Sequence, residues 1–191
     1  MSYDWDKRAK EWEMEPATIR YAEKAFEELE NIINVTNLRV FDFGCGTGLL
    51  SQKIAPLAKD IVALDSSEAM IEELDKKFLP NVEPVVDILS RGLIAQHPAF
   101  RGQFDCVIAS SVCGFIENFQ EAAELIYLLL EDEGIFVHWD WLAENEQKGL
   151  TEAKVEQVLI DAGFDTVSVS VPFEVETEQG TLSVIMGIGE K

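Results

Sequence analysis

The stretch FDFGCGTGLLS, from Phe41 to Ser51, contains three glycines at alternate positions, with Asp42 just before them. An apolar run typical of a buried strand, Leu38–Phe43, leads into it, and a segment with helical character follows. Because glycine has no side chain, the backbone can turn sharply there and a ligand can approach it closely. One glycine would suffice for a turn that only packs a helix on a strand. Three glycines therefore predict a ligand-binding loop between a strand and a helix.

The spacing of the glycines narrows the class of ligand. A nicotinamide or flavin site requires GxGxxG, but the third glycine position is occupied by leucine or serine, whichever glycine the count starts from. A Walker loop requires GK[ST], and Lys53 lies too far along the chain. Asp42 disfavours a bound pyrophosphate, because like charges repel at short range. The loop is therefore predicted to bind a nucleoside joined to a positively charged amino acid.

Two further acids end the next two predicted strands. Asp65 closes the strand Asp60–Asp65, 21 residues after Gly44, and an acid about 20 residues beyond a glycine loop can accept hydrogen bonds from ribose hydroxyls. Asp87 follows the strand Val82–Val86, where it can accept from an exocyclic amine. Each acid alone could cap a helix. Acids at the ends of three successive strands favour a nucleoside site at one edge of the sheet.

The rest of the chain alternates between predicted strands and helices. The predicted strands are 38–43, 60–65, 82–86, 104–110, 134–141, 166–177 and 180–189, and the predicted helices are 16–34, 48–60 (interrupted by Pro56), 68–79, 119–130 and 151–164. Such alternation predicts an α/β fold, a parallel sheet with helices on both faces, extended by a C-terminal antiparallel hairpin. No linker rich in proline, glycine or serine divides residues 1–191, so we expect a single domain.

Composition and charge exclude several classes of protein. The chain of 191 residues is 47% apolar, and no segment approaches the roughly 18 consecutive apolar residues of a membrane span, so we expect a soluble cytoplasmic protein. Fifteen Lys and Arg against 36 Asp and Glu leave a net charge of −21, which repels nucleic acids and anionic membranes. Three cysteines and two histidines, without CxxC or HExxH, predict no metal site.

With these residues in view, the chain resembles the class I S-adenosylmethionine-dependent methyltransferases. The resemblance covers the chain from about Trp5 to Gly189, and it is carried, in order, by VFDFGCGTGLLS, ALDSSEAM, VVDIL, FDCVIASSV, EGIFVHWD and DAGF. It implies a doubly wound three-layer sandwich whose seven strands lie in the order 3-2-1-4-5-7-6, with the seventh antiparallel. It also implies S-adenosylmethionine as the cofactor.

The resemblance assigns the methionine part of the cofactor to the glycine loop. Asp42 and the backbone of Gly44, Cys45 and Gly46 would face it, and Ser110, after the fourth strand, would lie nearby.

The nucleoside part is assigned to the neighbouring strand ends. Asp65 would hold the ribose hydroxyls, and Ser66 and Met70 would border the adenine. Asp87 would accept from the adenine amine, with the backbone of Ile88 beside it.

The acceptor site is less defined by the sequence. Residues 1–36, with Trp12, are similar to the segment that covers the cofactor in small-molecule members, and the nucleic-acid NPPY motif is absent after the fourth strand. We therefore expect a small-molecule acceptor. Direct methyl transfer needs alignment and a dry pocket more than an acid or base. His138 and Asp140, on one face of the fifth strand, are candidates for acceptor binding or proton removal, although His138 could equally be a hydrogen-bonded residue inside the sheet.

Two alternatives remain open at this point. The chain could bind S-adenosylmethionine for interaction rather than catalysis, because no acceptor-site residue is unambiguous. An NAD-dependent oxidoreductase is the less favoured alternative, since the third glycine of its pattern is missing. The oligomeric state and the identity of the acceptor are not predicted.

Overall fold

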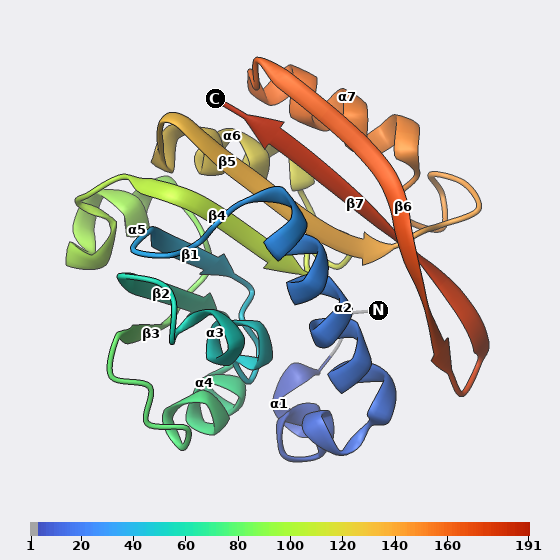
Figure 1. The fold of residues 1–191 in the computed structure, drawn as a ribbon, viewed down its shortest axis with the longest axis horizontal. Coiled ribbons are helices and arrows are strands. Elements are labelled where there is room, and N and C mark those ends of the chain that lie inside the picture. Colours follow the sequence, from blue (N-terminus) through green and yellow to red (C-terminus); the bar gives the residue numbers. More distant parts are fainter. Residues whose placement is uncertain (1–3) are drawn as a thin grey trace.

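The computed structural model describes residues 4–191 and contains a seven-stranded sheet in the order β3-β2-β1-β4-β5-β7-β6 (Figure 1). The strands are β1 (Arg39–Phe43), β2 (Asp60–Asp65), β3 (Val82–Val86), β4 (Phe104–Ser110), β5 (Leu130–Trp141), β6 (Thr166–Thr177) and β7 (Gly180–Glu190). The first five strands pair in parallel, and β7 is antiparallel to both of its neighbours. The predicted fold and strand order are confirmed.

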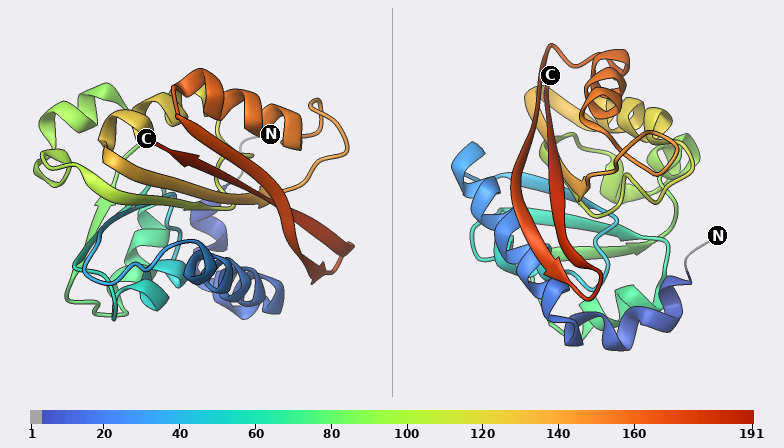
Figure 2. Two further views of the ribbon diagram at one scale, coloured as in Figure 1. Left: turned by 45° about the horizontal axis from the view of Figure 1, so that its top comes forward. Right: turned by 90° about the vertical axis from the view of Figure 1, so that its right-hand side faces the viewer.

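Helices cover both faces of this sheet and make it the middle layer of three (Figure 2). They are α1 (Trp5–Arg8), η1 (Ala9–Met14), α2 (Pro16–Ile32), α3 (Leu49–Ile54), α4 (Glu68–Asp75), α5 (Arg91–Gln96), η2 (Pro98–Phe100), α6 (Phe119–Leu129) and α7 (Glu152–Ala162). The helices α2, α3 and α4 lie on one face, and α5, α6 and α7 on the other. Among residues 4–191, no helix is long and apolar enough to cross a membrane.

Successive side chains of each strand pack alternately into the hydrophobic clusters on the two faces of the sheet. In β1, Phe41 and Phe43 join the cluster under α6 and α7, whereas Val40 joins the cluster under α2 and α3. Because successive strand residues point to opposite faces, an apolar strand supplies both clusters. Asp42 shares the face of Val40, so its carboxyl group is carried into the core below α3.

Several element boundaries differ from the prediction, and two of the differences have a clear physical reason. The helix after the glycine loop ends at Ile54, because the proline two residues later cannot continue it. The strand predicted at 134–141 begins earlier, because β5 starts at Leu130. The N–H of Glu133 donates to the carbonyl of Lys191, and the N–H of Lys191 donates to the carbonyl of Gly134, which extends this strand. The sequence around residue 130 does not indicate this pairing, because the partner lies far along the chain.

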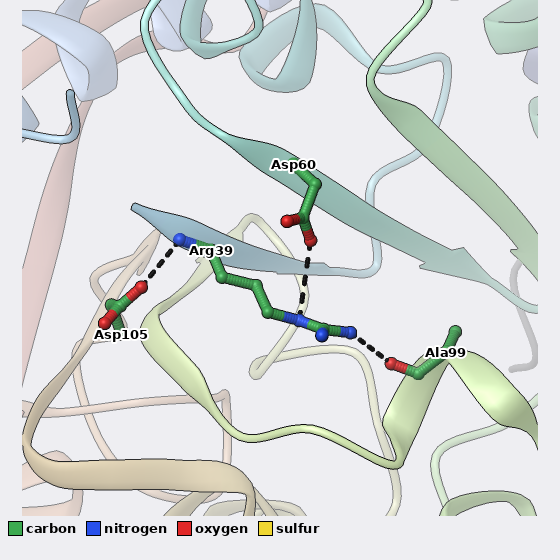
Figure 3. Close-up of polar contacts among 4 residues, drawn as sticks. All are labelled: Arg39, Asp60, Ala99 and Asp105. Carbon is green, nitrogen blue, oxygen red and sulfur yellow. Dashed lines mark hydrogen bonds and ion pairs between the residues drawn. The ribbon is translucent and has the colours of Figure 1, made fainter. Parts of the chain in front are cut away.

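The amino ends of the strands are tied together by Arg39 (Figure 3). Its backbone N–H donates to Asp105 (2.7 Å), and its guanidinium donates to the carbonyl of Ala99 (2.6 Å). Its Nε lies 3.4 Å from Asp60, an ion pair that falls short of hydrogen-bond geometry. The guanidinium also stacks over the ring of Phe104. One side chain therefore links β1, β2, β4 and η2.

Candidate active site

The glycine loop connects β1 to α3, as predicted, and is hydrogen-bonded to the neighbouring strand β2. The backbone N–H groups of Gly44 and Cys45 both donate to the carbonyl of Leu64 in β2 (2.8 and 3.0 Å). Gly44, Gly46 and Gly48 all have positive φ, at 69°, 54° and 78°. Only glycine adopts this left-handed region without steric cost, so the three-glycine pattern is a conformational requirement.

The three glycines face different surroundings. A Cβ at Gly44 would overlap Val112, in the loop after β4, and a Cβ at Gly48 would overlap Leu74 of α4. At Gly46 the nearest atom, the indole nitrogen of Trp12, would be 3.8 Å away. Gly44 and Gly48 are therefore needed for packing, whereas Gly46 leaves open space beside the predicted covering residue Trp12.

Asp42 is a buried acid with a single hydrogen-bond partner. Its side chain is 2% exposed and accepts from the hydroxyl of Ser51 in α3 (2.6 Å). Burial raises the pKa of Asp42 to about 7, the Ser51 hydrogen bond opposes this shift, and the charge of Asp65 adds to it. No lysine or arginine in residues 4–191 forms an ion pair with it. A cationic ligand group would supply the missing partner.

Asp65 holds the glycine loop against the start of α4. One carboxylate oxygen accepts from the N–H of Gly46 (2.8 Å) and the other from that of Ser67 (2.9 Å). Burial raises the pKa of Asp65, and these backbone hydrogen bonds oppose the shift. Each carboxylate oxygen has a second lone pair, so the group can still accept from a ligand's hydroxyls.

The predicted adenine residues occupy the same edge but differ in exposure. Ser66, Asp87 and Ile88 are exposed, Ile88 to 70%. The backbone N–H of Asp87 donates to the carbonyl of Asp65 (3.1 Å), which draws the ends of β2 and β3 together. Met70 is buried on the inner side of α4. Ser66, Asp87 and Ile88 are therefore accessible at the mouth of the site, whereas Met70 is buried beneath these residues.

A contact that the sequence did not predict joins the N-terminal segment to the site. The Ser67 hydroxyl donates to Asp6 of α1 (2.5 Å) and accepts from the N–H of Met70 as the cap of α4. Lys77 and Glu13 form an ion pair (2.6 Å) between the same two regions. Figure 1 shows α1 lying beside α4. No local sequence pattern indicates a hydrogen-bond partner that lies 61 residues away.

Aromatic rings extend from this segment across the glycine loop. Trp5 contacts Trp12 edge-to-face (5.7 Å between ring centroids) and Phe115 in the same way (5.3 Å). Trp12 lies beside Gly46, and Phe115 belongs to the loop after β4. The three rings therefore bridge the two sides of the site's mouth.

The loop after β4 is held by the acid at the end of β5. The Asp140 carboxylate accepts from the N–H of Gly114 (2.9 Å), and its other oxygen lies 2.8 Å from Nδ1 of His138. Ser110 ends β4, half-buried, and pairs across to Trp139. His138 has no exposed surface, and its Nε2 faces Gly187 of β7. His138 thus contacts Asp140 from inside the sheet, and its candidacy for acceptor binding stays a prediction.

The side chains of Cys113, His138 and Asp140 bring atoms of metal-binding type within 4.8 Å of one another. Burial raises the pKa of Cys113 well above its usual range, and the nearby Asp140 charge and hydrogen bond raise it further. Hydrogen bonding accounts for this cluster, and the prediction of no metal site stays a prediction.

The family match found by comparison with known proteins covers the half of the chain that contains the glycine loop. A family model described as a methyltransferase domain matches residues 41–136. An uncharacterized methyltransferase of Schizosaccharomyces pombe is 30% identical over 117 residues, which are 56% of this chain and 41% of that protein. Magnesium-protoporphyrin O-methyltransferase of Rhodobacter capsulatus is 35% identical over 82 residues, 40% of this chain and 33% of that protein. The chain thus spans less than half the length of these two relatives.

A likeness to solved structures extends over nearly the whole chain. The structure of a DhpI–SAH complex has a TM-score of 0.72 and 20% sequence identity, covering 96% of this chain and 91% of that one. At such identity the likeness concerns the fold alone. It agrees with the sheet order described above.

Proposed function

Since this chain belongs to the methyltransferase domain family, we propose that it transfers a methyl group from S-adenosylmethionine to a small-molecule acceptor. The observation that carries the proposal is Asp42, a buried acid near the end of β1 that has no cationic partner among residues 4–191. A charged carboxylate in such a position is unfavourable unless it is paired. The ammonium group of the methionine part would pair with it, which a dinucleotide's pyrophosphate could not do.

The other residues at this edge fit the rest of the cofactor. The backbone around Gly46 is open to close approach, and Asp65 has free lone pairs for the ribose hydroxyls. The exposed Asp87 and Ile88 would border the adenine, with Ser66 beside them. Because Met70 is buried on the inner side of α4, its proposed role is to support this surface from below.

The cofactor would supply an activated methyl group, and the chain's contribution is alignment and exclusion of water. The rings of Trp5, Trp12 and Phe115 cover the glycine loop from the outside. Asp140 fixes the loop after β4 through Gly114. In this proposal residues 4–36 form the cover of the cofactor as part of one domain, and Asp140 acts as a positioning residue.

The partner and location are part of the same proposal. The net charge of −21 disfavours a nucleic-acid acceptor, so a small molecule is favoured. The three cysteines are unpaired thiols, which fits a reducing compartment such as the cytoplasm.

Titration calorimetry of the folded protein with S-adenosylmethionine and with S-adenosylhomocysteine tests this function. We expect both to bind, and Asp42→Asn to abolish binding while keeping the fold. Absence of binding to either compound would refute the proposal, and binding of NAD(H) instead would favour an oxidoreductase. Turnover of labelled cofactor with any acceptor would exclude a purely non-catalytic binding protein.

A further inference from the structure

The loop that follows β4 forms one wall of the proposed cofactor site. This β4 loop, residues 111–116, packs on the glycine loop, since a Cβ at Gly44 would overlap the side chain of Val112. Phe115 of the same loop contacts Trp5 of the covering segment edge-to-face, with 5.3 Å between the ring centroids. The position of the β4 loop therefore determines both the space beside the glycine loop and the contact with the cover.

Hydrogen bonds to β5 hold the β4 loop in place. The N–H of Ser111 donates to the carbonyl of Trp139 (2.7 Å), and the N–H of Gly114 donates to the carboxylate of Asp140 (2.9 Å). Ser111 has a φ of 60°, a left-handed conformation that is unfavourable for a residue other than glycine. The loop therefore begins in a strained conformation, and the Asp140 side chain fixes its middle.

Asp140 is in turn held by His138, which lies two residues earlier on the same face of β5. One carboxylate oxygen accepts from Gly114, and the other lies 2.8 Å from Nδ1 of His138. Asp140 is 1% exposed and His138 has no exposed surface, so water does not replace either partner. A buried carboxylate is unfavourable unless its oxygens are hydrogen-bonded. The orientation of the Asp140 carboxylate therefore depends on both Gly114 and His138.

The surroundings of His138 fix the orientation of its imidazole ring. The ring stacks on Phe136 (5.4 Å between centroids) and contacts Phe119 edge-to-face (5.1 Å). Its Nε2 faces Gly187, where a Cβ would overlap it, and Nε2 has no hydrogen-bond partner among the described residues. Because a buried N–H without a partner is unfavourable, the neutral ring carries its proton on Nδ1. That proton is directed at Asp140.

The donor at Nδ1 explains why a histidine occupies this position. Its neighbours Phe136 and Phe119 belong to the apolar cluster under α6 and α7. An apolar side chain would fill this space without the cost of burying a polar ring. It would, however, leave one oxygen of the buried Asp140 carboxylate without its hydrogen bond. The polar ring is therefore accounted for by what it does to Asp140.

We propose that His138 is a positioning residue for methyl transfer: through Nδ1 it fixes the Asp140 carboxylate, which holds the β4 loop against the glycine loop and the cover. This inference rests on the proposed function, because it concerns the cofactor site of that reaction. His138 does not touch the cofactor in this assignment. It acts through Asp140 and Gly114 on Val112 and Phe115, which contact the glycine loop and the covering segment.

The variants His138→Asn and His138→Gln test this assignment, because they carry the same amide at different reach. The asparagine nitrogen takes the place of Nδ1 and can still donate to Asp140, whereas the glutamine nitrogen takes the place of Nε2, beside Gly187. Titration calorimetry of the folded variants with S-adenosylhomocysteine measures the effect. We expect His138→Asn to keep the affinity within about twofold and His138→Gln to lose about tenfold, as for one lost hydrogen bond.

Amide hydrogen exchange of residues 5–14 follows the cover in the same complexes. It should be about tenfold faster in His138→Gln than in His138→Asn, because the β4 loop would no longer hold Phe115 against Trp5. Phe115→Leu should reproduce the faster exchange, and since Phe115 is 40% exposed, this variant does not disturb the core.

His97→Gln is the matched control, at the other histidine of the chain. His97 accepts from the N–H of Ala99 at the start of η2, away from the glycine loop. The variant should lose stability and leave both S-adenosylhomocysteine affinity and exchange of the cover unchanged.

Equal affinities in His138→Asn and His138→Gln, at whatever level, would overturn the proposal and leave His138 a structural residue. Unchanged exchange in Phe115→Leu would equally overturn it, because the β4 loop would then not hold the cover. Failure of the natural protein to bind S-adenosylhomocysteine would instead count against the proposed function, so the two failures are distinguishable.

Discussion

The two ends of β1 treat a charged residue in opposite ways. At the amino end, Arg39 has partners on three neighbouring elements, through Asp60, Ala99 and Phe104. At the carboxyl end, three residues later, the hydrogen-bond partner of Asp42 in the described part of the chain is Ser51, through its hydroxyl. A partly buried charge with partners holds the fold together, whereas a fully buried charge without one makes the folded state less stable until a ligand pairs with it. The difference separates the structural end of the sheet from the binding end.

The same contrast holds for the backbone at the two ends. At the amino end, Arg39 connects the strand ends through contacts with other residues of the chain (Figure 3). The glycine loop beyond Asp42 has positive φ at every glycine, a conformation that other residues adopt only at a cost. Ligand sites commonly carry such costs, which the rest of the fold offsets. Changes at the two ends should therefore affect stability and binding differently.

The largest effect is expected from Asp42→Asn. Burial raises the pKa of Asp42 to about 7 in the folded state, from an ordinary value of 3.8. Between these pH values the folded protein keeps a proton that the unfolded chain releases, so its free energy of unfolding falls as pH rises towards 7. Asparagine does not titrate, so the variant should gain about 4 kcal/mol relative to the natural protein between pH 4 and pH 8. Urea denaturation across this pH range measures the difference.

The variant Ser51→Ala provides the control for this prediction. It removes the side-chain hydrogen bond that opposes the shift in the pKa of Asp42, so the loss of stability should extend to higher pH. A pH dependence that is identical in the natural protein and in Asp42→Asn would show that Asp42 is not the group responsible.

Gly44→Ala should have the next largest effect, about 3 kcal/mol of lost stability. The new Cβ must take a φ of 69° and overlap Val112. Thermal unfolding and S-adenosylhomocysteine titration should both show the loss, because Val112 and the glycine loop form one side of the site. Gly180→Ala is the matched control: it also has positive φ, at 112°, but its Cβ would meet no atom within 4 Å. Equal losses in both variants would argue against the contact with Val112.

Arg39→Met tests the amino end and should cost about 2 kcal/mol of stability. The carbonyl of Ala99 loses its donor and Asp60 its ion pair, whereas Asp105 keeps the backbone N–H of residue 39. S-adenosylhomocysteine affinity should not change in the folded protein. Arg91→Met, at an exposed position on α5, should leave both properties unchanged. A weakened affinity in Arg39→Met would mean that the two ends of the sheet are coupled.

The smallest effect is expected from Asp6→Ala, about 1 kcal/mol in S-adenosylhomocysteine affinity. Asp6 connects the covering segment to Ser67 (2.5 Å), and Ser67 still caps α4 in the variant. Amide hydrogen exchange of the N-terminal segment should become faster, with global stability nearly unchanged. Lys7→Ala removes a neighbouring exposed ion pair with Asp4 and should show neither effect. Unchanged exchange in Asp6→Ala would exclude Asp6 as the connection between the cover and α4.

Much of the binding end can be predicted from the sequence because its determinants are local. The apolar alternation of the strands, the positive φ required of the glycines, and the acids placed after β1, β2 and β3 are all visible as short patterns. Since the carboxyl ends of parallel strands meet at one edge of a sheet, these patterns also bring Asp42, Asp65 and Asp87 to one edge.

The partners of the side chains were decided only by the tertiary structure. The contacts of Arg39 with Ala99, of Ser67 with Asp6, and the burial of His138 behind Asp140 depend on which elements pack together. Tyr21 is unremarkable in a helical pattern, and its unpaired hydroxyl becomes visible only when α2 lies over the end of β5. Local spacing determines the conformation of a segment, but the charge balance around a buried group is a property of every element packed against it.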